Sequence, residues 1–519
     1  MMLSFIPLFL LELCALAEGI RVIRKTTLGA DPQTVNRLNG ESFQQDPITT
    51  LNGYQYAVLW ASDSANASVR HASVARRALS ASSDWETFRL TDYNQTDDDG
   101  HNVITMGVSR GDGTIHLAFD QHDNNLNYRV SRAGVASNPA NTPWTSDIFA
   151  PAGTLDHLPG LETLNKSTYF SNVTYPRFLS VPPRNASDEA DLFLELRVGR
   201  SGLGDDWIYL YTPQTGAWSQ VGRYLEGVNN NAYINGLDFD AQGVLHVTWT
   251  YRDYVNDVGQ NVAVEAGPNG PENNHDMNYA HSSDLGRTWR NNWGQRIASL
   301  DPAPTNVSAQ MPANAIDISD ADGGIPRTIV PASAGITMFG IPKYGGILNQ
   351  EAQTVDDEGR VHVLNRENTT GTERWYHYWR STSAHWTRTA LPLTLDPPSV
   401  NNITQTPTVI GKRGKLVALP ASATQTDTST PATLLALLPS NALLGPSSDA
   451  FTNVSTALSI LASTAAGHFR DWHVVWEVPR GCGAEPLFDR TRLQADGVLS
   501  VYLVNEGEVQ VWDLDVSGV

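Results

Sequence analysis

The octapeptide Ser282-Ser283-Asp284-Leu285-Gly286-Arg287-Thr288-Trp289 decides the fold of this chain. Its pattern, S-x-D-x-G-x-T-W, combines three residue types that suit a tight turn between β-strands. An Asp side chain accepts hydrogen bonds from turn amides, a Gly adopts backbone conformations that other residues resist, and a Trp packs between strands. The octapeptide therefore predicts a structural turn in a β-sheet protein and says almost nothing about catalysis.

Working outward, a second pattern recurs, in which a turn Gly precedes alternating apolar residues around a His. It occurs at Asp112–Leu117, Gln242–Val247 and Glu358–Val363, and without the His at Asp496–Val501. A second strand-like segment and a Trp follow the first three: Leu126–Ser131 with Trp144, Met277–Ser282 with Trp289, and Tyr376–Ser381 with Trp386. Helical periodicity is scarce, and repeated strand pairs indicate blades around a central axis. With blades of about 70 residues, we predict an all-β, seven-bladed β-propeller.

The composition of the 519 residues favours one large folded domain. Hydrophobic residues make up 40% and charged residues only 17%, whereas disordered chains are poor in aromatics and densely charged. The formal net charge is −20 and no basic run occurs, so binding to nucleic acid is not expected.

The first 17 residues read as a secretory signal peptide. The apolar run from Met1 ends in Ala15-Leu16-Ala17, which fits a signal-peptidase site, although Glu12 interrupts the run and no basic residue precedes it. The alternative is a buried N-terminal strand. The run is shorter than the roughly 20 apolar residues that span a membrane, so no membrane partner is expected.

Glycosylation sequons support the secretory route. Nine Asn residues lie in Asn-x-Ser/Thr, namely Asn66, Asn94, Asn165, Asn172, Asn185, Asn306, Asn368, Asn402 and Asn453. Removal of Cys14 with the leader would leave Cys482 alone, without an intrachain disulfide. We therefore predict a secreted, extracellular, glycosylated monomer in which residues 18–519 form a single propeller domain.

Polar residues gather where the expected strands begin and end. His101 and Asn102 precede one strand, and His122 follows the next. Propellers carry functional groups on loops at one end of the axial funnel, so these positions suit a site. Three other histidines lie inside strands and are interpreted as core residues: His116, His246 and His362.

Arg197 and Arg252 each end an apolar strand, where an unpaired charge is costly. They either form salt bridges between blades or bind a ligand carboxylate through paired guanidinium hydrogen bonds. Asp97-Asp98-Asp99 reads as a solvated acidic turn, with a structural calcium site as the alternative. The chain lacks Cys-x-x-Cys, His-Glu-x-x-His, P-loop and Gly-x-Ser-x-Gly motifs.

Together these motifs resemble those of the BNR-repeat polysaccharide lyases, and the octapeptide matches the Asp-box of sialidase-like propellers. The other matching motifs are Gly100-His101-Asn102, His116-Leu117-Ala118-Phe119-Asp120-x-His122, Tyr175-Pro176-x-Phe178, Arg197-x-Gly199-x-Ser201-Gly202 and Trp249-x-x-Arg252. Within that group the chain is most similar to secreted fungal L-rhamnose-α-1,4-D-glucuronate lyases, with ulvan lyases as more distant relatives. Two stretches depart from the pattern: Asp301–Gly345, expected as an inserted loop, and Ala421–Gly467, expected as weak strands of a late blade.

The resemblance implies a seven-bladed propeller that cleaves a uronate by β-elimination without a required cofactor. It implies five catalytic residues, His101, His122, Tyr175, Arg197 and Arg252, and we add Asn102, Arg177, Arg200 and Trp249 as substrate-binding candidates. The arginines would neutralise the carboxylate, which makes a metal unnecessary. The base would be His122 or Tyr175, and the acid Tyr175 or His101. The expected substrate is a plant arabinogalactan-type polysaccharide such as gum arabic, which would lose its terminal rhamnose.

Two other functions stay open. A sialidase-like glycoside hydrolase would need an Arg-Ile-Pro motif near the N-terminus, and Ile325-Pro326-Arg327 has another order. A non-catalytic glycan-binding propeller would need only the abundant Trp and Tyr. The products distinguish the three functions, because only a lyase makes an unsaturated uronate.

Overall fold

The computed structural model describes residues 19–80, 84–183, 190–199, 204–227, 230–253, 273–300, 326–371, 374–392, 413–421, 423, 432–439 and 456–519. The expected signal peptide, residues 1–17, lies outside them. Regular structure in these ranges is almost entirely β. The described helical segments are short: α1 (Lys166–Tyr169), α3 (Arg490–Asp496) and the 3-10 turns Pro139–Asn141 and Ser146–Ile148. No helix among the described residues is both long and apolar enough to cross a membrane.

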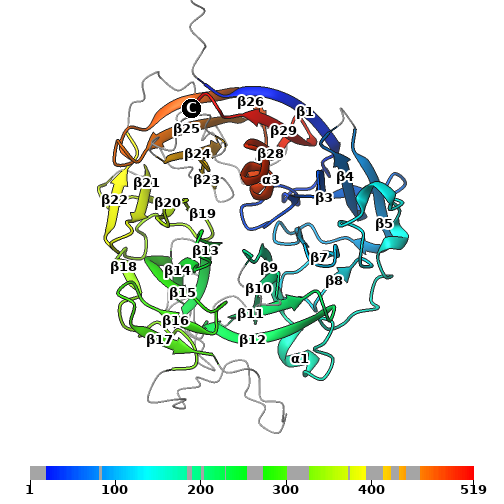
Figure 1. Ribbon diagram of the computed structural model, residues 1–519, viewed down its shortest axis with the longest axis horizontal. Helices are drawn as coiled ribbons and strands as arrows, with labels where there is room; N and C mark the ends of the chain where they lie inside the picture. The colour runs from blue at the N-terminus through cyan, green and yellow to red at the C-terminus, as the bar shows by residue number, and fades with distance from the viewer. Residues whose placement is uncertain are drawn as a thin grey trace, which may run out of the picture.

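The described strands form a ring of seven small sheets, as Figure 1 shows, and one pairing joins the sixth and seventh into a single eight-stranded sheet. The first sheet contains β2 (Ile48–Leu51), β3 (Tyr54–Ser62), β4 (Arg70–Ala78) and β5 (Glu86–Gln95), and the second β6 (Ile104–Val108), β7 (Ile115–Phe119) and β8 (Tyr128–Val130). The third contains β9 (Val173–Ser180), β10 (Leu192–Val198), β11 (Asp205–Thr212) and β12 (Ala217–Leu225). The fourth contains β13 (Asn230–Phe239), β14 (Leu245–Asp253), β15 (Asn274–Ser282), β16 (Thr288–Arg290) and β17 (Arg296–Ser299), with β18 (Thr337–Phe339) added to β15.

The remaining three sheets complete the ring. The fifth contains β19 (Ala352–Val355), β20 (Val361–Glu367), β21 (Arg374–Arg380) and β22 (Trp386–Ala390). The sixth contains β23 (Lys415–Ala418), β24 (Thr433–Pro439), β25 (Thr456–Thr464) and β26 (His473–Cys482). The seventh contains β27 (Leu487–Phe488), β28 (Val498–Asn505), β29 (Glu508–Asp515) and β1 (Arg21–Ala30), and it joins the sixth through the pairing of Cys482 with Asn505. The predicted seven-bladed all-β propeller is confirmed.

The octapeptide forms the predicted turn between β15 and β16. Asp284 accepts a hydrogen bond from the Thr288 backbone N–H at 2.8 Å, and Gly286 has φ +84°, a region that favours glycine. Trp289 is completely buried and its ring stacks on Tyr224. The turn is structural, as its residue types predicted.

The three repeat histidines are core residues, which confirms their interpretation. His116 lies between Thr114 Oγ1 at 2.8 Å and Tyr128 Oη at 2.5 Å, and burial lowers its pKa to about 3. His246 and His362 are bonded in a similar manner, each with one ring nitrogen at an Asp carboxylate. These histidines satisfy buried polar groups within blades and are not available to a ligand.

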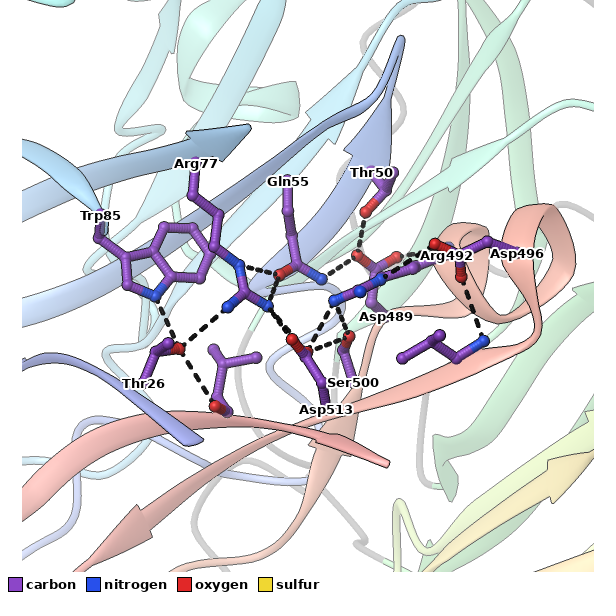
Figure 2. Close-up of polar contacts among 12 residues, drawn as sticks. Thr26, Thr50, Gln55, Arg77, Trp85, Asp489, Arg492, Asp496, Ser500 and Asp513 are labelled. Carbon is purple, nitrogen blue, oxygen red and sulfur yellow. Dashed lines mark hydrogen bonds and ion pairs between the residues drawn. The ribbon is translucent and has the colours of Figure 1, made fainter. Parts of the chain in front are cut away.

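Chain closure joins the first and last strands of the described chain. β1 pairs antiparallel with β29, with Val22 opposite Leu514, and the two strands lie side by side in Figure 1. Figure 2 shows the polar cluster beneath this closure, where the Arg77 guanidinium donates to both Asp513 carboxylate oxygens at 2.8 Å. Arg492 of α3 donates to the same carboxylate at 2.7 Å. The cluster links the first sheet, the seventh sheet and α3.

The two unusual stretches differ from each other. In Asp301–Gly345, residues 301–325 lie outside the described residues, and the rest is not simply a loop because Thr337–Phe339 forms β18 on the edge of β15. Since β16 pairs with β15 only at His281, the earlier residues of β15 offer an edge that β18 covers. In the later stretch, residues 422, 424–431 and 440–455 lie outside the described residues, and Leu434–Leu438 lies within β24 of the sixth sheet, which confirms a late-blade strand there.

Candidate active site

The five candidate catalytic residues lie at one end of the ring. His101 precedes β6, Tyr175 is near the start of β9, and His122 follows β7, while Arg197 and Arg252 are near the ends of β10 and β14. Because adjacent strands are antiparallel, the start of an inner strand and the end of its neighbour lie on the same side. The fold therefore brings together side chains from three consecutive sheets.

The two histidines form a stacked pair. Their ring centroids are 3.8 Å apart and their planes differ by 20°. The Asp99 carboxylate contacts both rings, with Oδ1 2.5 Å from His101 Nδ1 and Oδ2 2.5 Å from His122 Nδ1. Phe43 also stacks on His101, with ring centroids 5.8 Å apart.

A β-bulge places Tyr175. Glu195 pairs with Arg177 and Arg197 pairs with Thr174, so two residues of β9, Tyr175 and Pro176, lie opposite a single residue of β10. Tyr175 consequently has φ +56°, a conformation that is uncommon outside glycine and often occurs at functional sites. The bulge turns this tyrosine toward the histidine pair, and its ring centroid is 5.7 Å from that of His101.

Each of the two arginines lies against the ring of a tyrosine in the candidate site. The Arg197 guanidinium carbon lies 5.0 Å from the Tyr175 ring centroid, and that of Arg252 lies 4.5 Å from the Tyr233 ring centroid. Arg197 is almost fully buried and its Nη2 is 3.1 Å from Asp123 Oδ1. Within the described part of the chain, Arg197 Nε has no hydrogen-bond partner, which leaves part of the guanidinium for a ligand.

Arg252 contacts neutral groups. Its Nε donates to Asn274 Oδ1 at 3.0 Å and its Nη1 donates to Tyr233 Oη at 3.3 Å. The two arginines thus differ, since Arg197 has an acidic neighbour bonded through one nitrogen and Arg252 is held by an amide and a phenol. This arrangement agrees with the hypothesis that the pair binds an external carboxylate.

Burial and charge set the protonation of the site. Burial raises the pKa of Tyr175 well above its ordinary value, so the phenol keeps its proton at neutral pH. Burial also lowers the pKa of His101. The charges of His122 and Arg197 lower this pKa further, whereas the Asp99 carboxylate raises it. Burial opposes the ionisation of Asp99, but hydrogen bonds from both histidines hold its pKa well below the ordinary range. The site thus contains a neutral imidazole and a protonated phenol.

The substrate-binding candidates are not all part of this cluster. Asn102 is buried beside it, and its backbone carbonyl accepts a hydrogen bond from the Trp60 indole at 2.7 Å. Arg177 is buried and donates to Gln45 Oε1 and the Ile234 carbonyl. Trp249 is completely buried in the hydrophobic core of the fourth sheet and its neighbours, because strand alternation points it away from the site. Arg200 lies outside the described residues.

Among the described residues, one group of side chains could hold a metal ion. Ligand atoms of Asp99, His101 and His122 lie within 4.8 Å of one another. Two imidazoles and one carboxylate suit zinc better than calcium, which prefers oxygen ligands. The neighbouring Asp98 carboxylate accepts the backbone N–H groups of Val35 and Asn36, both at 2.8 Å. A structural calcium at Asp97–Asp99, the alternative to a solvated turn, stays a hypothesis.

A cavity of about 160 Å³ lies at the opposite ends of the inner strands, where Val108, Ser180 and Phe239 line it beside α3. None of the five catalytic candidates lines it. This cavity is therefore separate from the five catalytic candidates. The candidate site is identified by the chemical types of its side chains and not by the size of a cavity.

Four contributors to the cluster are absent from the sequence-based set of candidates: Phe43, Asp99, Asp123 and Tyr233. Asp99 is not selected as a site residue from the sequence because Asp97–Asp99 is interpreted as a solvated turn. Its position two residues before His101 is a sequence signal that could identify it. Asp123 directly follows His122 and reaches Arg197. Phe43 and Tyr233 carry no sequence signal, since only the fold brings them to the axis.

The geometry defines an acidic, all-β propeller with a histidine pair, a buried tyrosine and two arginines at one end of its axis. A family model described as "BNR repeat-containing family member" matches residues 54–393. The match covers well over half of the 519 residues. The chain therefore belongs to the BNR repeat-containing family.

Among curated proteins, the chain is similar to ulvan lyases. It is 27% identical over 161 residues to the long isoform from Alteromonas sp. (strain LOR), which is 27% of this chain and 15% of that protein. It is 26% identical over 165 residues to the short isoform from the same strain, covering 30% of that protein. The chain thus matches less than a third of the length of these relatives.

Solved structures share the fold over nearly the whole chain. Polysaccharide lyase Uly1 superposes with a TM-score of 0.60 and 15% identity, covering 95% of this chain and 99% of that one. A PL25 ulvan lyase bound to -[GlcA(1-4)Rha3S]- gives a TM-score of 0.56 and 13% identity, covering 93% and 96%. At this identity the likeness establishes a common propeller architecture.

Proposed function

We propose that this protein is a polysaccharide lyase that cleaves a glucuronate linkage by β-elimination. The observation that carries the proposal is the convergence of a carboxylate-held histidine pair, a protonated tyrosine and two arginines at one end of the axis. Similarity to ulvan lyases, one of which was solved with a glucuronate–rhamnose ligand, supports a uronate as the reacting sugar.

The proposed reaction removes the proton on C5 of the glucuronate and breaks the bond between C4 and its oxygen. The C5 proton is weakly acidic while the neighbouring carboxylate is charged. Arg197 and Arg252 would pair with that carboxylate and stabilise the enolate-like charge that develops on it. Donors placed at a developing oxyanion contribute about 3 kcal/mol each.

Proton transfer would use the remaining three residues. A neutral imidazole can accept the C5 proton, and we assign this role to His122, with His101 beside it. Tyr175 is assigned as the acid because its raised pKa keeps the phenolic proton available for the departing oxygen. The electron pair of the C5–H bond becomes the C4–C5 double bond, and the leaving oxygen takes the phenolic proton.

We further propose that the substrate is a rhamnosyl-α-1,4-glucuronate cap of an arabinogalactan-type polysaccharide, and that the protein is a secreted monomer. Breaking the C4–O bond of such a cap releases free rhamnose and leaves an unsaturated glucuronate on the polymer. The resemblance of the site motifs to fungal rhamnose-glucuronate lyases supports this choice.

Incubation with gum arabic tests the proposal. A lyase with this specificity releases rhamnose, measured by chromatography, while ultraviolet absorbance of the unsaturated uronate rises in proportion. Rhamnose without the absorbance would identify a hydrolase, and polymer shortening without rhamnose would identify an endo-acting lyase. Binding without release of any sugar would identify a lectin.

A further inference from the structure

Asp99 bridges the two histidines of the candidate site with one carboxylate. Each carboxylate oxygen lies 2.5 Å from a different Nδ1, and the two rings stack on each other with Tyr175 beside His101. We propose that Asp99 is a positioning residue that fixes the orientation and tautomer of His101 and His122. This inference rests on the proposed lyase function and adds a residue that acts through the histidines.

The hydrogen-bond chemistry of a carboxylate explains why the bridge decides the tautomer. An ionised carboxylate only accepts hydrogen bonds, so both Nδ1 atoms must carry the proton that they donate. Each neutral ring then presents an unprotonated Nε2, which is the atom that can accept a proton from a substrate. Because both rings are tied to one group and stacked nearly in parallel, both Nε2 atoms point away from Asp99.

The local backbone holds the carboxylate in place. Oδ1 of Asp99 also accepts the backbone N–H of His101 at 3.0 Å, and the Asp99 carbonyl accepts the N–H of Asn102 at 3.0 Å. The acidic group is therefore part of the same turn as His101, which leads into β6, whereas His122 comes from the loop after β7. One side chain joins two loops that are distant in the sequence.

The two neighbouring aspartates have different surroundings and provide internal controls. The Asp98 carboxylate caps the backbone N–H groups of Val35 and Asn36, each at 2.8 Å. The side chain of Asp97 is exposed. Three consecutive acidic residues therefore separate into one that organises the site, one that fastens the N-terminal segment, and one that faces solvent.

Several charged and titratable groups surround the histidine pair, and the negative charge of Asp99 acts together with them on the protonation of His101. The histidine rings lie 3.8 Å apart, Tyr175 lies beside His101, and the positive charge of Arg197 acts on His101. Burial lowers the pKa of His101, the Asp99 carboxylate opposes this shift, and the neighbouring His122 ring and Arg197 add to it. Loss of the carboxylate charge removes the group that favours a protonated His101, so the acidic limb of the pH–rate profile should shift to lower pH.

The Asp99→Asn variant tests the proposal at nearly constant shape. Its amide has one acceptor oxygen in place of two, so one histidine loses its acceptor and can rotate or change tautomer. We expect kcat on gum arabic to fall about 10- to 100-fold, with KM changed by less than about twofold, because the residue does not touch the substrate. Asp97→Asn and Asp98→Asn, which make the same chemical change, should keep the wild-type pH profile.

A readout that does not depend on activity separates this inference from the proposed function. In nitrogen-15 spectra of histidine-labelled protein, His101 and His122 should both carry the proton on Nδ1 when neutral, and Asp99→Asn should change the tautomer of at least one. Wild-type tautomers and pH profile in Asp99→Asn would overturn the inference even if the protein is a lyase. One equivalent of metal in the wild type, lost in Asp99→Asn, would also overturn it by making Asp99 a metal ligand. If the wild type produces no unsaturated uronate, the lyase function fails while the spectra still test the bridge.

Discussion

The Tyr175 ring lies 5.0 Å from the Arg197 guanidinium carbon and 5.7 Å from the His101 ring centroid, and it thus joins the cationic and imidazole parts of the site. A phenol in this place can reach a leaving oxygen on a sugar whose carboxylate is held by arginines. Its raised pKa makes it a proton donor rather than a base at neutral pH.

The Tyr175→Phe variant should therefore lose the phenolic proton donor and keep the aromatic ring in place. We expect kcat to fall about 10²- to 10⁴-fold, since general acid catalysis contributes that much, while the ring contacts with Phe43 remain. Initial rates of ultraviolet absorbance increase measure the loss. Tyr233→Phe is the matched control, because it removes a phenol that contacts Arg252 and should reduce kcat less. An equal loss of kcat in the two variants would contradict the assignment of Tyr175 as the general acid.

Arg197 and Arg252 should contribute to turnover rather than to folding. Arg252→Ala should reduce kcat/KM about 10²- to 10³-fold, the usual loss for one oxyanion donor, with an unfolding midpoint close to the wild type. Arg197→Lys retains a positive charge beside Asp123 but loses the planar guanidinium fork, so we expect a similar loss of activity. A large drop in the unfolding midpoint of both variants would instead support the interpretation as structural salt bridges.

Much of the fold could be predicted because its signals are local. The turn at Asp284 and the repeated turn glycines each specify one strand pair, and a blade length of about 70 residues then gives the number of blades. The convergence of His101 and His122 also followed from strand order, since both lie at strand ends.

The rest of the site depends on contacts between distant segments. Nothing in the run Asp97–Asp99 shows that the third carboxylate turns toward the histidines, and Phe43 reaches them from the N-terminal segment. Trp249 shows the opposite case, because a motif match suggested a ligand contact while strand alternation buries the side chain in the core.

His275 should make stability depend on pH. Burial opposes its protonation, but the carboxylates of Asp253 and Asp276, at 2.9 and 3.0 Å, raise its pKa to about 9. The folded-state pKa lies above the ordinary value of 6.5, so this stabilisation is full below about pH 6.5 and is lost as pH rises through about 9. The difference corresponds to about 3 kcal/mol.

The unfolding midpoint of the wild type should therefore fall between about pH 6.5 and pH 9 more than that of His275→Gln, which cannot gain the charge. Chemical unfolding at several pH values in this range measures the difference. Identical pH dependence in the two proteins would show that the imidazolium contributes nothing to stability.

The Arg77–Asp513 pair in Figure 2 should stabilise ring closure. Both side chains are almost fully buried, and removal of one partner of a buried pair costs about 3–5 kcal/mol. Arg77→Met should therefore lower the unfolding midpoint strongly, while the proposed lyase activity should remain at room temperature because the pair contacts no catalytic candidate.

Arg21→Met is the matched control for this closure. Arg21 pairs with Asp515 at 2.8 Å across β1 and β29, but its side chain is 78% exposed, and exposed pairs contribute about 0–1 kcal/mol. A similar effect of the two substitutions would mean that closure depends on strand pairing alone.

The His122→Phe variant tests the assignment of the base. A phenyl ring can keep the stacking on His101, but it has neither the Nε2 that is proposed to accept the C5 proton nor the Nδ1 that lies 2.5 Å from Asp99 Oδ2. We expect both rhamnose release and the rise in ultraviolet absorbance to disappear. Calorimetry with a rhamnosyl-glucuronate disaccharide should show binding close to that of the wild type, because removing a proton carrier leaves most ground-state contacts intact. His101→Phe provides the comparison, since it removes the other ring from the same carboxylate. Activity retained in His122→Phe but lost in His101→Phe would transfer the role of base to His101, and activity retained in both variants would make Tyr175 the leading candidate.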